Sequence, residues 1–419
     1  MKKKLHYKWI VTALCFMMVL TTLGFCSGNR SLFLSAITEA LDLPRTAFAF
    51  SDSIRYIFTA FVNIFFGNLV RKFGTKKLIG AGFLSLIGFA ALYAIADNVF
   101  TFYLGSAFLG IGLSWTTTTM VGWIIGRWHK ENKGTIMGAV LAANGIGGAI
   151  ATQIISPIIY QPDRPFGYRN AFWLIVVILF CMGLLIMIFY RDAPQDESNQ
   201  IPHANKKNRG QSWEGLDFEL IKKQPYFYSF LICILLTGMI LQGAWGVCAA
   251  HMRDSGLDSS YIATIISISS LGLTGSKFLT GVLYDKLGLR CTIALCDLSA
   301  VFALIALAMI GHTGTGSIAA AGFGIIICLA LPLETIMLPI FAGDLFGERS
   351  YDKALGLLVS VNTTGYAVGA PLTNLFFDQF GTYTPLFFIY AGLMLVITCV
   401  SQFNVTAVHN LRKATTMTT

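Results

Sequence analysis

Residues 67–77 read GNLVRKFGTKK, and a related stretch, GVLYDKLGLR, occupies residues 281–290. Each stretch begins with a glycine, carries two charged residues at the fifth and sixth positions, and has a second glycine at the eighth position followed by basic residues. The second glycine allows a tight turn and the basic residues hold a loop in the cytosol, so both stretches are predicted to be short cytoplasmic loops between helices. The first glycine is expected to permit close helix contact. The residues of this repeated motif are Gly67, Gly74, Gly281, Asp285, Gly288 and Arg290.

Apolar segments surround both copies of the motif. Each is near the length of about 20 residues that spans a bilayer as a helix, and the motif follows the second and the eighth of them. The twelve predicted spans are Trp9–Ala36, Ala47–Val70, Lys77–Ala96, Phe100–Gly126, Thr135–Tyr160, Asn170–Tyr190, Tyr226–His251, Tyr261–Tyr284, Cys291–Gly311, Ser317–Phe346, Ala354–Phe377 and Pro385–Val405.

The position of the motif divides the chain into two related halves. Matching loops after the second helix of each half are typical of transporters built from parallel repeats related by an axis along the membrane normal. The sequence predicts an all-α membrane protein with twelve transmembrane helices in two pseudo-symmetric six-helix bundles, at residues 1–190 and 226–419. Residues 191–225, which are polar and charged, are predicted to be a cytoplasmic linker, and the second bundle ends in a short cytoplasmic tail.

The composition excludes a soluble protein. Charged residues make up 12% of the chain against roughly 25% in soluble domains, while 55% of residues are hydrophobic and mean hydropathy is +0.66. The nine cysteines form no CxxC pair or Cys/His cluster, so no metal site, disulfide framework or cofactor is indicated. No nucleophile–base set is evident either, and an enzyme is not expected. The basic N-terminus imitates a signal peptide, but the apolar run that follows is long enough to be a retained first helix.

The distribution of basic residues predicts the topology. With the predicted spans, 23 of the 30 Lys and Arg residues fall in one set of alternate loops and in both termini. This asymmetry places both termini and the linker in the cytoplasm by the positive-inside rule. The net charge of +9 is therefore explained by membrane topology, and no nucleic-acid partner is predicted.

Several stretches along the whole chain resemble those of one family. They are Gly24–Leu41 (GFCSGNRSLFLSAITEAL), Thr119–Gly148 (TMVGWIIGRWHKENKGTIMGAVLAANGIGG), Phe166–Trp173 (FGYRNAFW), Leu333–Met337 (LETIM) and the GTYTPL that ends at Leu386. With these stretches the chain resembles the major facilitator superfamily, and within it the monocarboxylate transporter group with the related bacterial oxalate/formate antiporters. The resemblance implies transport of a small organic anion.

Three residues depart from the pattern of that family, at two places in the chain. The superfamily motif often has Asp where this chain has Arg71, and the monocarboxylate group often has Asp and Arg in the eighth helix where this chain has Leu273 and Lys277. The second departure puts the proton-coupling chemistry of the family in doubt, but not the binding of an anion.

Lys277 and Arg30 are the two candidate basic residues for substrate binding. Lys277 lies eight residues before Asp285, hence roughly 12 Å deeper along the helix, where an ammonium group would hold a carboxylate. The alternative is a side chain that snorkels to the interface. Arg30 lies near the outer end of the first helix and matches the approximate position of a substrate-recruiting residue in the family; its alternative is an interface anchor.

The remaining ionisable residues within spans are acids and one arginine. Asp52 and Arg55 are three residues apart and so can face each other as a structural ion pair, or as a gating or proton-carrying pair. Glu334 lies between two prolines that can make a hinge, and it is a candidate proton carrier or partner of Lys277, or else a structural carboxylate. Asp297 is expected to be structural.

Polar residues on the fourth, fifth and eleventh spans complete the candidate substrate site. Trp115 and Thr116, in the run SWTTTT, could line the pathway, although Thr often bonds its own helix. Asn144 and Asn362 lie in glycine-rich spans and are candidates either for the cavity or for contacts between helices.

The favoured function is alternating-access transport of a small organic anion, a monocarboxylate, through a midplane cavity between the two halves. Protons or a counter-anion are the expected coupling partners, the bilayer of the cell membrane is the surroundings, and a monomer is expected. The alternatives are efflux or exchange of another small solute by the same fold, and a membrane sensor that binds its ligand without transport.

Overall fold

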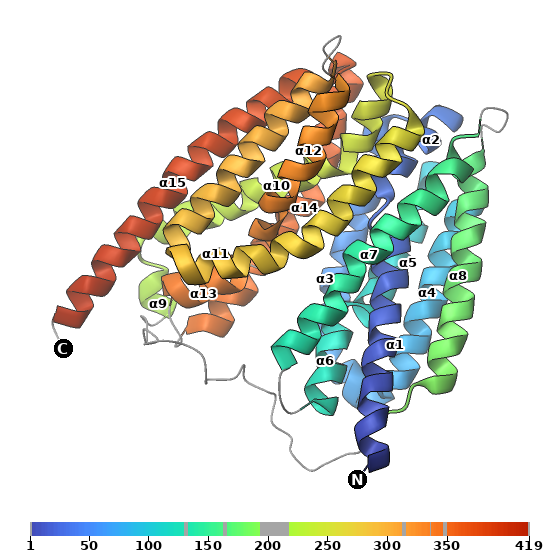
Figure 1. The fold of residues 1–419 in the computed structure, drawn as a ribbon, viewed down its shortest axis with the longest axis horizontal. Helices are drawn as coiled ribbons and strands as arrows, with labels where there is room; N and C mark the ends of the chain where they lie inside the picture. The colour runs from blue at the N-terminus through green and yellow to red at the C-terminus, as the bar shows by residue number, and fades with distance from the viewer. Residues whose placement is uncertain are drawn as a thin grey trace. The chain divides into compact units, whose positions relative to one another are not determined.

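The computed structural model describes residues 2–129, 133–161, 166–192, 218–311, 316–335, 337–346 and 350–417, and contains no strand within them. The helices are α1 (Lys2–Cys26), α2 (Arg30–Ala40), α3 (Arg45–Phe73), α4 (Thr75–Ile95), α5 (Val99–Thr116), α6 (Thr118–Trp128), α7 (Lys133–Ile159), α8 (Gly167–Phe189), α9 (Phe218–Ile221), α10 (Pro225–Asp254), α11 (Ser259–Ala308), α12 (Gly316–Ala330), α13 (Met337–Phe346), α14 (Tyr351–Phe380) and α15 (Thr384–Met417), with short 3₁₀ turns η2 (Met309–Gly311) and η3 (Leu331–Glu334). Figure 1 shows the course of the chain.

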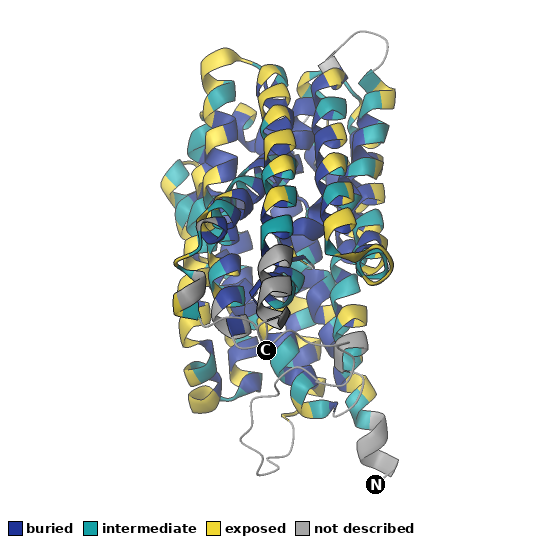
Figure 2. Ribbon diagram, turned by 90° about the vertical axis from the view of Figure 1, so that its left-hand side faces the viewer, coloured by how far each residue is buried: buried dark blue, intermediate teal, exposed yellow. Residues whose placement is uncertain are grey.

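The predicted transmembrane spans are confirmed as helices. Eleven helical segments of the described chain are long and apolar enough to cross a membrane. One of them, α11, has 50 residues and holds two predicted spans on either side of Gly288, where the backbone is not helical. Many helices carry buried residues on one side and exposed ones on another (Figure 2), and large apolar side chains such as Phe100, Phe278 and Ile64 are at least 75% exposed. Lipid is the solvent that such surfaces require.

The chain forms two compact units, one of residues 1–205 and 258–271 and one of residues 206–257 and 272–419. The first turns of α11 thus belong to unit 1, which differs from a division at the linker, so the bundle boundaries predicted from the sequence remain a proposal. Most of that linker, residues 193–217, lies outside the described residues, and α9 lies within its last part.

Corresponding helices pack closely in the two units. In unit 1, α1 packs along α7, and a Cβ at Gly147 would collide with the backbone of Leu20. In unit 2, α10 packs along α14, and a Cβ at Gly365 or Gly369 would collide with the backbone of α10. These are the first and fifth spans of each half, so the same glycine-mediated contact recurs at matching positions, as two related repeats require.

Three predicted spans are interrupted in the structure, and only for the tenth did the sequence indicate a break. The first breaks at residues 27–29, between α1 and α2, so that Arg30 begins a second helix. The fourth breaks at Thr117, where φ is −120° and ψ is −146°, inside a run of threonines whose hydroxyls bond preceding carbonyls. The tenth breaks at η3, where Pro332 cannot donate a helical hydrogen bond.

The second glycines of the repeated motif act as predicted. Gly74 ends α3 and precedes α4 with φ +82°, and Gly288 interrupts α11 with φ +75°. Both values lie in the region that favours glycine. No atom of the described residues within the same unit lies within 4 Å of a Cβ built on Gly67 or Gly281, so the close helix contact expected of the first glycines remains a prediction. Farther along, Arg290 joins α11 to α15 by donating from Nε to the Gln402 side chain at 3.1 Å.

Candidate functional site

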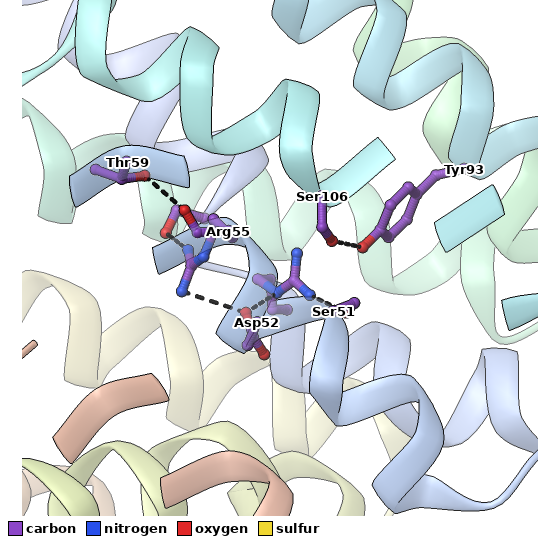
Figure 3. A network of polar contacts seen from close by, with 8 residues as sticks. Ser51, Asp52, Arg55, Thr59, Tyr93 and Ser106 are labelled. Carbon is purple, nitrogen blue, oxygen red and sulfur yellow. Dashed lines mark hydrogen bonds and ion pairs between the residues drawn. The ribbon is translucent and has the colours of Figure 1, made fainter. Parts of the chain in front are cut away.

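Unit 1 holds a buried cluster of charges built on α2 and α3. Arg30 Nε lies 2.6 Å from Asp52 Oδ1, and Arg55 Nη2 lies 3.2 Å from the same oxygen. The side chains are between 8% and 18% exposed. Figure 3 shows the Arg55 guanidinium beside Asp52, joined to it by a dashed line. The predicted pairing of Asp52 with Arg55 is thus present, and Arg30 joins it with the shorter contact.

Neighbouring side chains fix the two guanidinium groups of this charge cluster. Arg30 Nη2 donates to Ser51 Oγ at 2.8 Å, and Arg55 Nη1 donates to Ser27 Oγ at 2.7 Å. The Arg30 guanidinium also lies over the ring of Tyr93, 5.9 Å from its centroid. The break between α1 and α2 makes this possible, because it sets Ser27 beside one arginine while Arg30 starts the next helix.

The cluster contains two cations and a single anion. Both ion pairs use the same oxygen of Asp52, and Arg55 Nε is buried without a hydrogen-bond partner among the described residues. A guanidinium has five N–H donors, so several remain for a further acceptor. Excess positive charge in a buried site is costly, and a second carboxylate would offset that cost while using the remaining donors.

Unit 2 holds a second charged pair, on α11 and η3. Lys277 lies within electrostatic range of Glu334, and the described residues provide no hydrogen bond or ion pair for its ammonium group. Glu334 is 5% exposed, and its Oε2 accepts a hydrogen bond of 2.7 Å from Gln242 Nε2. Its other oxygen, Oε1, is buried without a partner in the described chain. Glu334 therefore remains a candidate for carrying a proton or balancing Lys277.

The local backbone sets the positions of this pair. Ser276 Oγ donates to the carbonyl of Cys328 at 2.5 Å and so joins α11 to α12 next to Lys277. After α12 the chain tightens into η3, and the carbonyl of Glu334 faces Asn362 Nδ2 and Tyr366 OH of α14, each at 3.5 Å. The proline expected to make a break in this span is Pro332; the side chain of Pro339 lies outside the described residues.

The other predicted site residues differ in what surrounds them. Thr116 is fully buried and donates to the Gly112 carbonyl of its own helix at 2.8 Å, which is the arrangement expected of a packing residue. Trp115 has its indole nitrogen buried without a partner among the described residues. Asn144 is partly buried on α7, and Asn362 is 3% exposed on α14. Roles for all four in substrate binding remain predictions.

Sequence reasoning missed two features of these sites. The pairing of Arg30 with Asp52 joins residues of two helices, and no spacing rule predicts such a contact. Gln242, the partner of Glu334, was not singled out, because the neutral polar residues considered were those of the fourth, fifth and eleventh spans. An amide within the apolar α10 is itself a signal, since a polar side chain there needs a partner.

Comparison with known proteins places the chain in a family. The sequence profile of the Major Facilitator Superfamily matches residues 10–343. The chain belongs to the major facilitator superfamily. Members of this superfamily are transporters and not enzymes, and the chain is a multi-pass membrane transporter of a small solute.

Relatives within the superfamily are distant and have varied names. The sialic acid transporter NanX of Escherichia coli is 22% identical over 346 residues, which cover 81% of this chain and 80% of NanX. The hexuronate transporter of Bacillus subtilis is 20% identical over 85% of each chain. Others are named for multidrug resistance. Among solved structures, the nucleoside transporter NupG superimposes with a TM-score of 0.74 at 16% identity, over 96% of this chain and 99% of NupG, which shows a shared superfamily fold.

Proposed function

We propose that this superfamily member moves a small organic anion, a monocarboxylate, across the cell membrane by alternating access. The observation that carries the proposal is the excess of buried positive charge in unit 1, where Arg30 and Arg55 share one oxygen of Asp52. A carboxylate is the simplest solute that would use the remaining guanidinium donors, and bidentate binding is the geometry that arginine favours.

The second unit supports the same solute class. Lys277 provides an ammonium group that the described residues leave without a hydrogen bond, and Glu334 is near enough to balance it when no solute is present. A transporter of organic cations would instead need acids in excess. The names of two relatives agree with an anionic solute, because sialic acids and hexuronates are both sugar acids.

Pairs of solutes that differ only in charge test this proposal. The purified protein would be heated with a panel of small carboxylates and with the amide of each. A ligand at 100 times its Kd stabilises the folded state by about 2.7 kcal/mol, so a bound carboxylate should raise the melting temperature while its amide should not. Equal stabilisation by acid and amide, or stabilisation only by neutral or cationic solutes, would contradict an anion site.

The position of the termini and the membership of the monocarboxylate group belong to the same proposal. Both rest on the sequence: the first on the distribution of basic residues, the second on stretches such as Gly24–Leu41. The chemical structure of a carboxylate identified in the thermal screen would show how similar the solute is to the solutes of the monocarboxylate group.

A further inference from the structure

A small cavity lies inside unit 2, and neither Lys277 nor Glu334 is among the described residues that line it. Its walls come from α10, α11, η3, α13, α14 and α15 and are mostly apolar. The polar side chains that line it are Cys233, Thr237, Asp297, Asn362 and Ser401. The cavity has room for one water molecule or one small ion and is far too small for an organic solute.

Among the described residues, Asp297 is the only carboxylate that lines this cavity. It is 2% exposed, and its Oδ2 is buried with no hydrogen-bond partner among the described residues. Within the described chain no lysine, arginine or histidine lines the cavity or forms an ion pair with Asp297. An isolated buried carboxylate is too costly to remain charged, so it needs either a proton or a bound cation. The sequence-based expectation that Asp297 is merely structural does not account for this.

Asp297 lies at a depth in the membrane at which ionisable residues commonly have a function. It lies nine residues after the turn at Gly288, hence about 14 Å along the helix, close to the middle of a hydrocarbon layer of about 30 Å. Ionisable residues at that depth are rare because they are costly, and they commonly mark ion or proton pathways.

We propose that Asp297 binds a coupling cation, H⁺ or Na⁺, inside the second unit of this transporter. Either occupant neutralises the carboxylate, and the hydroxyl groups of Thr237 and Ser401 with the amide oxygen of Asn362 are ligands of the kind that hard cations take. The proposal does not depend on the nature of the transported solute, and it adds a site to the candidates Glu334 and Asp52.

The other described groups that face Asp297 carry no charge, so Asp297 is the acid that would bind the cation. From α10 the facing titratable group is Cys233, and on its own helix Cys296 is adjacent. The cavity residues of η3, α13, α14 and α15 are Leu333, Leu338, Phe341, Asn362 and Ser401, none of which carries a charge.

Infrared spectroscopy of the purified full-length protein tests whether Asp297 binds a proton. A protonated carboxyl group has its own C=O stretching band, which should grow as the buffer changes from mildly alkaline to mildly acidic. Asp297→Asn should remove part of this growth, and Glu334→Gln identifies the part that comes from the other buried acid. Asp378→Asn is the matched control, because Asp378 is an exposed acid of α14 that does not line the cavity.

Equilibrium binding of radioactive Na⁺ tests whether Asp297 binds Na⁺ instead of a proton. If Na⁺ is bound, the wild type binds it, Asp378→Asn binds it equally, and Asp297→Asn loses it. If Asp297→Asn does not fold, Asp297→Glu keeps the carboxyl group one methylene away and should shift the midpoint of the band or the Na⁺ affinity by about fivefold or more. The proposal is overturned if the replacement of Asp297 changes neither signal, or if its band responds to neither pH nor Na⁺.

Discussion

At the scale of single residues, the balance of buried charge identifies the side chains that are candidates for function. Asp52 holds two arginines with one oxygen, and Lys277 has one acid within electrostatic range. The sequence predicted which ionisable residues lie within spans, because hydropathy alone identifies them. It did not predict that Arg30 joins Asp52, because this contact depends on how α2 folds back on α3.

Removal of the shared acid should destabilise the protein strongly. Asp52→Asn leaves Arg30 and Arg55 buried without their anion, and the loss of one partner from a buried ion pair costs about 3–5 kcal/mol. The matched control is Asp97→Asn, since Asp97 pairs with Arg169 but is 75% exposed and should cost less than about 1 kcal/mol. Thermal unfolding in detergent measures both. Equal shifts in the two variants would contradict the buried charge cluster.

Replacement of Lys277 separates substrate binding from anchoring at the interface. Lys277→Ala removes a charge-assisted hydrogen bond to a carboxylate and should weaken its binding about 10- to 100-fold, while Lys277→Glu should be worse. Lys277→Arg keeps the charge and should retain part of the affinity. The control is Lys286→Ala, an exposed lysine of the same helix. Near-normal affinity in Lys277→Ala would exclude this residue from the site.

At the scale of helices, most of the fold was predictable and the interruptions were not. Spans such as Ala47–Val70 lie within helices of the structure because length and hydropathy define them. The breaks at residues 27–29, Thr117 and η3 arise from local competition for backbone hydrogen bonds, which a hydropathy pattern does not report. Of the three breaks, only η3 was indicated by the sequence, through the prolines of the tenth span. Those breaks are also where the candidate residues Arg30, Trp115 and Glu334 lie.

The two glycines of each motif should respond in opposite ways to alanine. Gly74→Ala and Gly288→Ala place a Cβ at positive φ and should destabilise the protein by about 1–2 kcal/mol. Gly67→Ala and Gly281→Ala lie in helices, with open space around the new Cβ, and should stabilise by about 0.5–1 kcal/mol. Melting temperatures of the four variants measure this. The same sign for all four would contradict the assigned backbone.

At the scale of the whole molecule, the superfamily match and the apolar helices define a transporter in a membrane. The superfamily match and the glycine contacts of α1 with α7 and of α10 with α14 agree with the repeated architecture that the motif predicts. The solute could be predicted only as a class, because charge selects an anion while its size and shape depend on contacts that no motif specifies.

The two ends of α4 test the orientation in the membrane. In a cysteine-free background, Lys77→Cys is predicted to face the cytoplasm and Asp97→Cys the outside, and both positions are exposed. A membrane-impermeant maleimide added to intact cells should therefore label Asp97→Cys alone, and should label Lys77→Cys only after the cells are opened. Labelling of Lys77→Cys in intact cells would reverse the topology.

Flux into proteoliposomes tests the central claim most directly, because it separates a transporter of anions from a sensor and from an exporter of other solutes. Vesicles containing the purified protein would receive a labelled carboxylate that stabilises it, or the matching amide, with and without a pH gradient. We predict uptake of the carboxylate, no uptake of the amide, and loss of uptake in Arg30→Gln and Lys277→Ala. Binding of the carboxylate without uptake, or uptake of neutral or cationic solutes that carboxylates do not inhibit, would contradict the account.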